Sequence, residues 1–204
     1  MSRLADQQQP VDGRVARRER NIAAVLDVVL EMFAHDMMFP TIEQASRRSG
    51  LSSRSLYRYF ADPGELIEAA IRRSNDQVTE FAHLPHIGQG GFDRRLTDFV
   101  ALRLRLHEGF GAMYRATLHN ATAHPRVGDE LQRNRERMRR QFERQFAPEL
   151  AALPSPVRAA AAEAGNLLTQ MDALDLLRRH RALTVAETGA VLRDGLAALL
   201  VRRG

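Results

Sequence analysis

The sequence predicts an all-α protein of about nine helices, with a small N-terminal helical domain followed by a larger C-terminal one. Apolar residues recur at helical spacing along most of the 204 residues, as in Ile22, Leu26, Val29 and Phe33. Capping residues and prolines separate these segments. Glycine and proline cluster once near the middle of the chain, at residues 83–91, which indicates a hinge loop between the two domains.

The composition excludes several classes of protein. Hydrophobic residues make up 44% of the chain and charged residues 27%, the balance of a soluble globular protein. No apolar run approaches the ~18 residues that a membrane span needs, and the polar N-terminus lacks the apolar segment of a secretory signal. We therefore expect no membrane contact and a cytoplasmic location. Without cysteine or lysine, thiolate metal sites, Cys nucleophiles, Schiff-base chemistry and the P-loop lysine are also excluded.

The N-terminal helices are expected over residues 17–35, 41–48, 52–60 and 63–82. Thr41 and Ser52 stand where N-caps are needed, and Asp62-Pro63-Gly64-Glu65 combines a cap, a proline at the first helical position and a glutamate that reaches back. The fourth helix is expected to bury one apolar face: Ile67, Ile71, Val78 and Phe81.

Five further helices are expected over residues 92–107, 110–122, 126–146, 156–179 and 184–201. Residues 101–106 alternate apolar side chains with arginine, which is locally strand-like, but Leu and Arg favour helices. The arginine-rich 126–146 segment is interpreted as a solvated helix face with ion pairs at i,i+3 and i,i+4 rather than as a binding site for anions.

Residues 41–60 carry the most informative pattern. A helix-turn-helix needs a small residue where its helices cross, a glycine at the turn and an apolar anchor in the second helix. Ser46, Gly50 and Leu56 meet these needs at the right spacing. Further core positions are filled by Ile42, Ala45, Leu51 and Phe60.

With the residues that follow, this segment resembles the TetR family of transcriptional regulators. The resemblance rests on Thr41, Gly50, the run Ser55-Leu56-Tyr57-Arg58-Tyr59-Phe60, and Glu65-Leu66 at the next helix. It covers about residues 17–82, and the closing segment from residue 177 looks like the last two helices of many such regulators.

Three departures from the family pattern stand out. Met37 replaces the usual glycine after the first helix, serines occupy the small-residue positions 46 and 49, and Pro63 replaces a lysine that commonly contacts phosphate.

The second short helix is interpreted as the recognition helix. Small serines in its first turn let the backbone approach DNA, and Arg54 can project into the major groove to bind guanine. Arg58 lies one turn further on the same side. The resemblance implies that Tyr57 and Tyr59 contact phosphates, while Thr41 and the first-helix arginines add phosphate or minor-groove contacts. The expected DNA-binding residues are Arg14, Arg17, Arg18, Thr41, Ser52, Ser53, Arg54, Ser55, Tyr57, Arg58 and Tyr59.

The resemblance further implies a homodimer and a small-molecule effector. Similar regulators dimerise through their last two helices, here about residues 156–179 and 184–201, where the small residues 159–165 allow close approach and Leu192, Leu196 and Leu199 seal the seam. An effector pocket of apolar walls and a few polar groups is expected at Phe99, Met113, Tyr114, Asn166 and Gln170. Asn166 and Gln170 could equally be exposed or bonded across the dimer seam.

The expected organisation is a flexible arm (1–13), a helix-turn-helix domain (14–62), a connecting helix (63–82), a hinge loop (83–91) and an effector and dimerisation domain (92–204). The expected function is a repressor that leaves a palindromic operator in double-stranded DNA when an effector binds. The alternative is a helical binding protein of the same fold with weak or lost DNA binding, which Pro63 and a net charge of −1 over residues 1–80 favour. An enzyme is the third class, but we find no catalytic constellation, no cofactor motif, and histidines (83, 86, 119, 124) without the carboxylates that a metal site needs.

Overall fold

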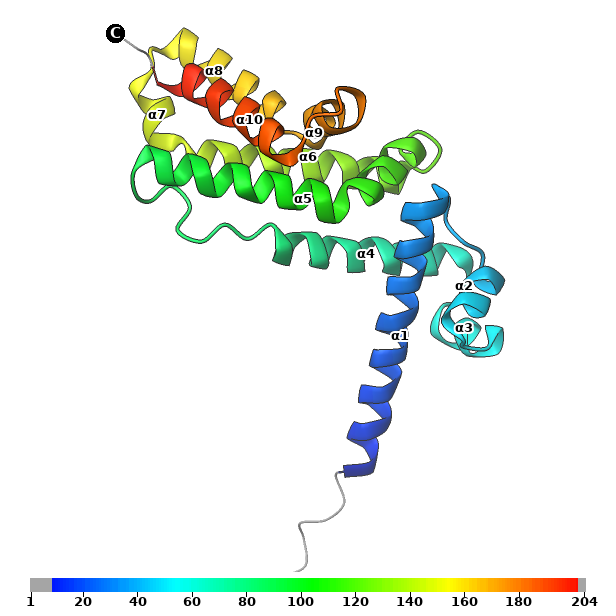
Figure 1. Ribbon diagram of the computed structural model, residues 1–204. Helices are drawn as coiled ribbons and strands as arrows, with labels where there is room; N and C mark the ends of the chain where they lie inside the picture. Colours follow the sequence, from blue (N-terminus) through cyan, green and yellow to red (C-terminus); the bar gives the residue numbers. More distant parts are fainter. Residues whose placement is uncertain (1–8, 202–204) are drawn as a thin grey trace, which may run out of the picture. The chain divides into compact units, whose positions relative to one another are not determined.

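The computed structural model describes residues 9–201, and within this range all regular structure is helical (Figure 1). The chain divides into two compact units, one up to Gln77 and one from Val78 onward, so the boundary falls inside a helix. The helices are α1 (Gln9–Asp36), α2 (Ile42–Ser49), α3 (Ser53–Tyr59), α4 (Pro63–Phe81), α5 (Phe92–Asn120), α6 (Pro125–Gln145), α7 (Ala147–Ala152), α8 (Ser155–Leu168), α9 (Met171–Asp175), a π-helical turn η1 (Leu176–His180) and α10 (Val185–Leu200). None of these helices is both long enough and apolar enough to span a bilayer.

The first unit is a three-helix head with α4 packed on α1. Val25, Val29 and Phe33 of α1 are buried, as are Leu56 and Phe60 around α3. Asp27 of α1 accepts two hydrogen bonds from the Arg73 guanidinium, at 3.0 and 2.9 Å, and one from the Gln77 amide at 2.8 Å. This bidentate contact helps to orient α4 against α1.

Helix α1 begins earlier than expected. The apolar periodicity starts near Arg17, yet the helix already includes Gln9 to Ala16. Proline suits the first turn of a helix and Arg and Ala favour helix, so a helix persists here without an apolar face. This half of α1 extends beyond α2 and α3 (Figure 1), and residues 1–8 of the expected arm lie outside the described residues.

Met37 occupies the position of the glycine that is usual after the first helix. Its φ is +60°, in the left-handed region that favours glycine, and its N–H closes α1 by donating to the Phe33 carbonyl at 3.0 Å. The backbone has therefore kept the glycine conformation although the residue has changed.

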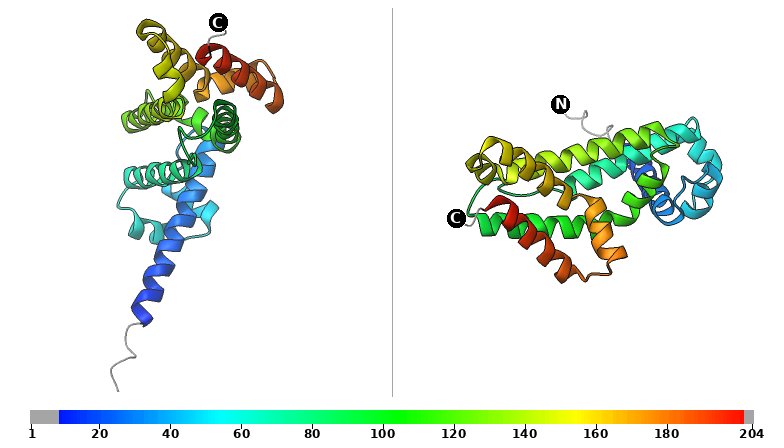
Figure 2. Two further views of the ribbon diagram at one scale, coloured as in Figure 1. Left: turned by 90° about the vertical axis from the view of Figure 1, so that its left-hand side faces the viewer. Right: turned by 90° about the horizontal axis from the view of Figure 1, so that it is seen from above.

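In the second unit α5 and α6 run antiparallel, and α8 and α10 pack against them (Figure 2). The two helices expected at 92–107 and 110–122 are one, because Gly109 and Gly111 do not interrupt α5. Each interior glycine costs only about 1 kcal/mol, and α5 is held along its length by α6, α9 and α10.

The helix expected at 156–179 is divided instead. It ends at Leu168, where Thr169 returns its hydroxyl to the Gly165 carbonyl at 2.9 Å, and it continues as α9 and the π-turn. A Thr hydroxyl that bonds back to the preceding turn competes with the backbone ladder.

Three phenylalanines form the centre of this unit. The ring centroids of Phe142 and Phe146 are 5.1 Å apart, and Phe99 lies 5.9 and 5.1 Å from them. Gly165 of α8 packs directly on this cluster, since a Cβ there would lie 2.3 Å from the Phe142 ring. The small-residue run at 159–165 therefore serves partly to bring α8 onto α6 within one chain.

The expected dimer seam is wrong in two of its residues. Leu192 and Leu196 are fully buried in the core of their own protomer, so they cannot also face a partner. Helical periodicity shows that α10 has an apolar face but not which neighbour covers it. The large apolar side chains that α8 and α10 expose are instead Leu167 and Val191.

The i,i+3 and i,i+4 ion pairs expected in the arginine-rich 126–146 segment are confirmed. In α6, Arg133 and Arg137 bind Glu130, and Arg139 pairs with Glu136 and Glu143 at i,i+3 and i,i+4.

The left-handed Met37 predicts a stabilising substitution. Met37→Gly relieves a backbone strain of about 1–2 kcal/mol in the folded state. Glycine also gives the unfolded chain more conformational freedom, which offsets part of this stabilisation. We therefore expect a net gain of about 0.5–1 kcal/mol in the free energy of unfolding. Gly50→Ala, which places a side chain at φ +74° in the same unit, is the matched opposite and should destabilise. Urea unfolding checks both, and a lower midpoint for Met37→Gly would contradict the strain argument.

Candidate nucleic-acid interface

Thr41 fixes the start of α2 through a reciprocal cap. Its hydroxyl accepts a hydrogen bond from the Gln44 backbone at 3.2 Å, while its own backbone N–H donates to the Gln44 side chain at 2.7 Å. Two of the free N–H groups at a helix start are satisfied in this way. The N-cap expected at Thr41 is thus confirmed.

The turn between α2 and α3 has the geometry of a helix-turn-helix. Gly50 ends α2 with a left-handed φ of +74° and donates its N–H to the Ser46 carbonyl. The Ser46 hydroxyl in turn donates to the Leu51 carbonyl at 2.6 Å. A serine at this crossing is therefore used as a hydrogen-bond donor and is not merely tolerated.

Helix α3 buries one residue and presents the others. Leu56 is wholly buried, whereas Arg54, Tyr57 and Arg58 are exposed at the i, i+3, i+4 spacing of one helix face. Among the described residues, Arg54 has no ion-pair or hydrogen-bond partner. Three of the residues expected to meet DNA from this helix are therefore brought together on its outer side.

The serines of the first turn have local partners. The Ser52 hydroxyl caps α3 by accepting from the Ser55 N–H at 3.2 Å, and the two hydroxyls lie 3.0 Å apart. Ser53 is half-buried. The hydroxyls of Ser52 and Ser55 therefore already hold the start of α3.

Tyr57 reaches back across the turn to α2. Its hydroxyl donates to the Glu43 carboxylate at 3.2 Å, although about half of the ring is exposed. Backbone hydrogen bonding, and then this phenol, hold the pKa of Glu43 below its ordinary value, and the bond to Glu43 raises the pKa of Tyr57. Sequence reasoning missed Glu43, since nothing in the spacing of residues 43 and 57 marks them as partners.

Tyr59 connects α3 to the arginines of α1. The guanidinium carbons of Arg18 and Arg58 lie 5.6 and 5.4 Å from its ring centroid, within cation–π range. Hydrogen bonds from Asn21 and then Arg58 lower the pKa of Tyr59.

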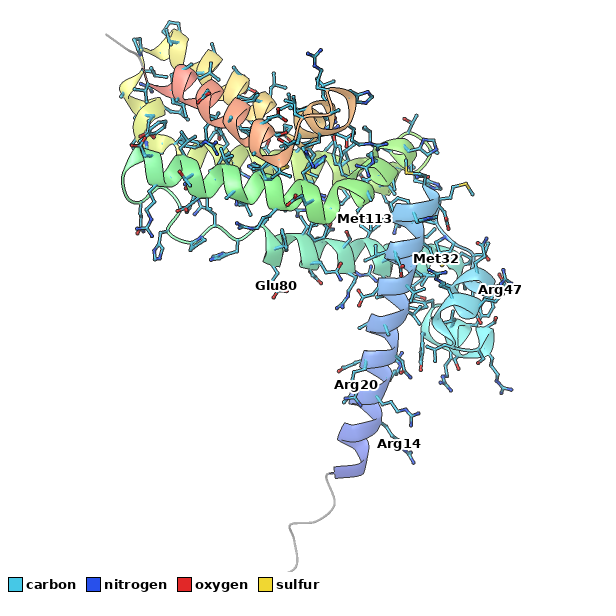
Figure 3. All side chains as sticks on the ribbon, viewed as in Figure 1. Arg14, Arg20, Met32, Arg47, Glu80 and Met113 are labelled. Carbon is cyan, nitrogen blue, oxygen red and sulfur yellow. The ribbon has the colours of Figure 1, made fainter. Side chains whose placement is uncertain are left out.

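The α1 arginines continue this surface. Arg14, Arg17 and Arg18 share one face at i, i+3, i+4 and are exposed. Figure 3 shows Arg14 and Arg20 reaching out from the free half of α1 and Arg47 from α2. Arg48 pairs with Glu31 at 3.6 Å. The unit thus carries a basic stripe along α1 that meets α3 at Tyr59.

The start of α4 follows the expected capping pattern. The Asp62 carboxylate accepts from the Glu65 N–H at 2.9 Å, and Glu65 accepts from the Ala61 N–H at 2.6 Å. Pro63, which stands in place of the family's lysine, is part of this helix start and supplies no positive charge.

The residues expected to bind an effector lie in the second unit. Arg135 donates to the Tyr114 hydroxyl at 3.3 Å and to Asp172, and its carbonyl accepts from Gln170. Gln170 also donates to Asn166 at 2.6 Å. Burial raises the pKa of the Tyr114 phenol, and Asp172 adds to this shift.

The remaining two expected residues, Phe99 and Met113, also lie on α5 in this unit. Phe99 is fully buried in the aromatic core, and Met113 is half-buried one residue before Tyr114. Within residues 9–201, no three His, Asp or Glu side chains come together as a metal site would require.

Known proteins resemble the chain in sequence over less than half of its length, and in fold over most of it. It is 35% identical over 86 residues to the HTH-type transcriptional regulator BetI of Escherichia coli O127:H6 (strain E2348/69 / EPEC), covering 41% of this chain and 43% of that protein. The same regulator from Escherichia coli O139:H28 (strain E24377A / ETEC) is 34% identical over the same shares. The chain thus spans less than half the length of the curated relatives it matches.

A solved structure extends the similarity to both units. The crystal structure of a TetR-family transcriptional regulator from Rhodococcus sp. superposes with a TM-score of 0.64 and 14% identity, covering 89% of this chain and all of that one. No protein-family model matches the chain. The resemblance to the TetR family is confirmed, and the fold is that of a TetR-family regulator.

The contact between Tyr57 and Glu43 predicts a titration. Tyr57→Phe removes a hydrogen bond that stabilises the carboxylate, so the pKa of Glu43 should rise toward its ordinary value. Side-chain carboxyl shifts followed by NMR against pH measure it. Glu187, whose pKa is lowered by its cap at Thr184, should not change. An unchanged Glu43 would show that the contact is absent in solution.

Proposed function

We propose that this protein is a DNA-binding transcriptional regulator, a repressor that a small-molecule effector releases from its operator. The exposed face of α3 carries the proposal, because it sets an unpaired Arg54 beside Tyr57 and Arg58 on a helix with only Leu56 buried. A guanidinium of this kind binds guanine O6 and N7 bidentately in the major groove.

The flanking groups have a different role in this proposal. The hydroxyls of Tyr57 and Tyr59, the Thr41 cap and the α1 arginines would meet phosphate, which sets register and carries no base information. The hydrogen bond between Tyr57 and Glu43 would be exchanged for one to phosphate on binding.

We further propose a homodimer that reads a palindrome, with recognition helices about 34–36 Å apart. Helices α8 and α10, which lie within the two segments expected to form the interface, expose apolar residues that suit a partner. Leu167 is 66% exposed and Val191 39%. The exposed Ala159 and Ala160 add a small-residue surface on α8 that permits close helix approach.

A helical binding protein without DNA binding is the second candidate. The Glu43 carboxylate beside Tyr57 would repel phosphate, Pro63 supplies no cation, and residues 1–80 carry a net charge of −1. The local basic stripe favours the first proposal, since the patch that meets a polyanion matters more than the sum.

Arg54→Ala separates the two candidates. Duplexes are first selected from a random pool by the wild-type protein, and affinities are then measured on the selected site and on a scrambled one. Because Arg54→Ala removes a base contact, its binding to the selected site should weaken by about 1–3 kcal/mol, and its preference for one base at one position should be lost. Tyr57→Phe should weaken binding to both duplexes equally, because a phosphate contact carries no base information.

Arg94→Ala removes an exposed arginine from α5 and should leave DNA binding unchanged. Failure of the wild type to select any sequence would favour the second candidate. Normal affinity of Arg54→Ala would place base readout on another helix.

Leu167→Glu tests the interface. A carboxylate in an apolar seam is costly to bury, so the variant should elute as a monomer on a sizing column while keeping its helical circular dichroism. Leu118→Glu changes a leucine of α5 that is 44% exposed and should leave the dimer intact. A Leu167→Glu variant that remains dimeric would move the interface away from α8.

A further inference from the structure

Arg103 of α5 is a fully buried arginine at the centre of the second unit. Its guanidinium donates to the Gln141 side-chain oxygen at 2.7 Å and to the Met138 carbonyl at 3.0 Å, both on α6. Its guanidinium carbon lies 4.4 Å from the ring centroid of Phe99. The third guanidinium nitrogen, Nε, is buried without a hydrogen-bond partner.

No carboxylate compensates this charge. Among residues 9–201, none lies within ion-pair distance of Arg103, and burial alone lowers its pKa to about 9. The neighbouring buried arginine differs in its charge compensation: the Nε of Arg95 is also unpaired, but its guanidinium binds the Glu149 carboxylate and the Gln145 carbonyl. A buried cation with neutral partners only is expensive to keep in a core.

The surroundings of Arg103 continue as an apolar strip. Residues 99, 103, 106 and 110 fall on one face of α5, and Phe110 stands about 10 Å along the helix from Arg103. Phe110 meets Phe81 of α4 edge to face, with centroids 5.3 Å apart, and Phe81 remains 42% exposed. Arg103 thus shares one face of α5 with an aromatic pair that is partly open to solvent.

We propose that Arg103 is the anchor for the effector, and that the effector is an amphipathic small molecule with one carboxylate. The carboxylate supplies the missing counter-charge and accepts from Nε, while the apolar body lies along α5 toward Phe110 and Phe81. This rests on the proposed function, because it assigns the ligand class of the proposed effector unit. Phe99, expected as a pocket wall, forms one side of the anchor.

The same site has a connection to α4. The Gln141 amide that accepts from Arg103 also donates to the Ala82 carbonyl at 2.8 Å, one residue past the end of α4. A carboxylate at Nε neutralises the guanidinium and so weakens its hydrogen bond to the Gln141 oxygen, which lets this amide turn. Helix α4 continues into the proposed DNA-binding unit. The effector would therefore change a contact at the end of the helix that both units share.

The first arm of the test needs no ligand. If Arg103 is kept for binding, Arg103→Met removes an uncompensated charge and the free protein should melt at the same or a higher temperature. Arg95→Met leaves Glu149 buried and unpaired, so its Tm should fall by several degrees. A fall for Arg103→Met as large as for Arg95→Met would show a structural arginine and overturn the proposal.

The second arm uses octanoate and benzoate, each with its neutral amide, in thermal melts of the full chain. We expect the carboxylates, but not octanamide or benzamide, to raise the wild-type Tm. The apparent Kd should be at least about tenfold weaker for Arg103→Met, the loss of one charged hydrogen bond, and Arg103→Lys should recover part of it.

Equal stabilisation of wild type and Arg103→Met, or none of the wild type by either carboxylate, would overturn the proposal. Neither arm contains DNA, so such a failure is distinct from a failure of Arg54→Ala to change operator affinity.

Discussion

The candidate recognition surface depends on the burial of Leu56 and Phe60. A helix of seven residues is far too short to be stable alone in water. It is held because these two side chains, 0% and 3% exposed, are buried in the core of the first unit, while Ser52 caps its start. With the anchoring done by two inward residues, Arg54, Tyr57 and Arg58 are left on the outside. The same constraint explains why Gly50 must turn the chain in a left-handed conformation, since a wider turn would move Leu56 out of its pocket.

The second unit combines a close-packed aromatic centre with buried polar side chains. Its centre is close-packed, with Gly165 seated on the Phe142 ring and no space for a Cβ. Yet buried arginines cross the same core, and the two are treated differently: Arg95 is neutralised by Glu149, whereas Arg103 has only carbonyl, amide and aromatic neighbours. Gln145 is part of this polar layer too, since it receives the Gly88 N–H and donates to the Arg95 carbonyl. The 83–91 loop, expected as a hinge, is thereby fastened to α6 at one point.

Local chemistry was readable from the sequence where one or two residues decide it. Thr41, Ser52, Asp62 and Thr184 cap helices as expected, because a cap depends only on residues three positions apart. The helix-turn-helix followed from the spacing of Ser46, Gly50 and Leu56, and the ion-paired face of α6 from its i,i+3 and i,i+4 charges. Met37 was visible as a departure from the family pattern, but its left-handed φ was not, because the backbone there is set by how α1 must end.

The sequence by itself therefore determined the all-α class, the helix-turn-helix and its outward residues, since periodicity and capping are local. Only the tertiary structure decided which apolar face meets which neighbour. Leu192 and Leu196 have the same helical spacing whether they face a partner or their own core, and only the packing of the neighbouring helices decides between the two. The alternation of apolar residues with arginine at 101–106 gave no sign that Arg103 would be the residue wholly enclosed. Its burial, and the bond between Glu43 and Tyr57, arise from contacts between helices, which a single helix period does not encode.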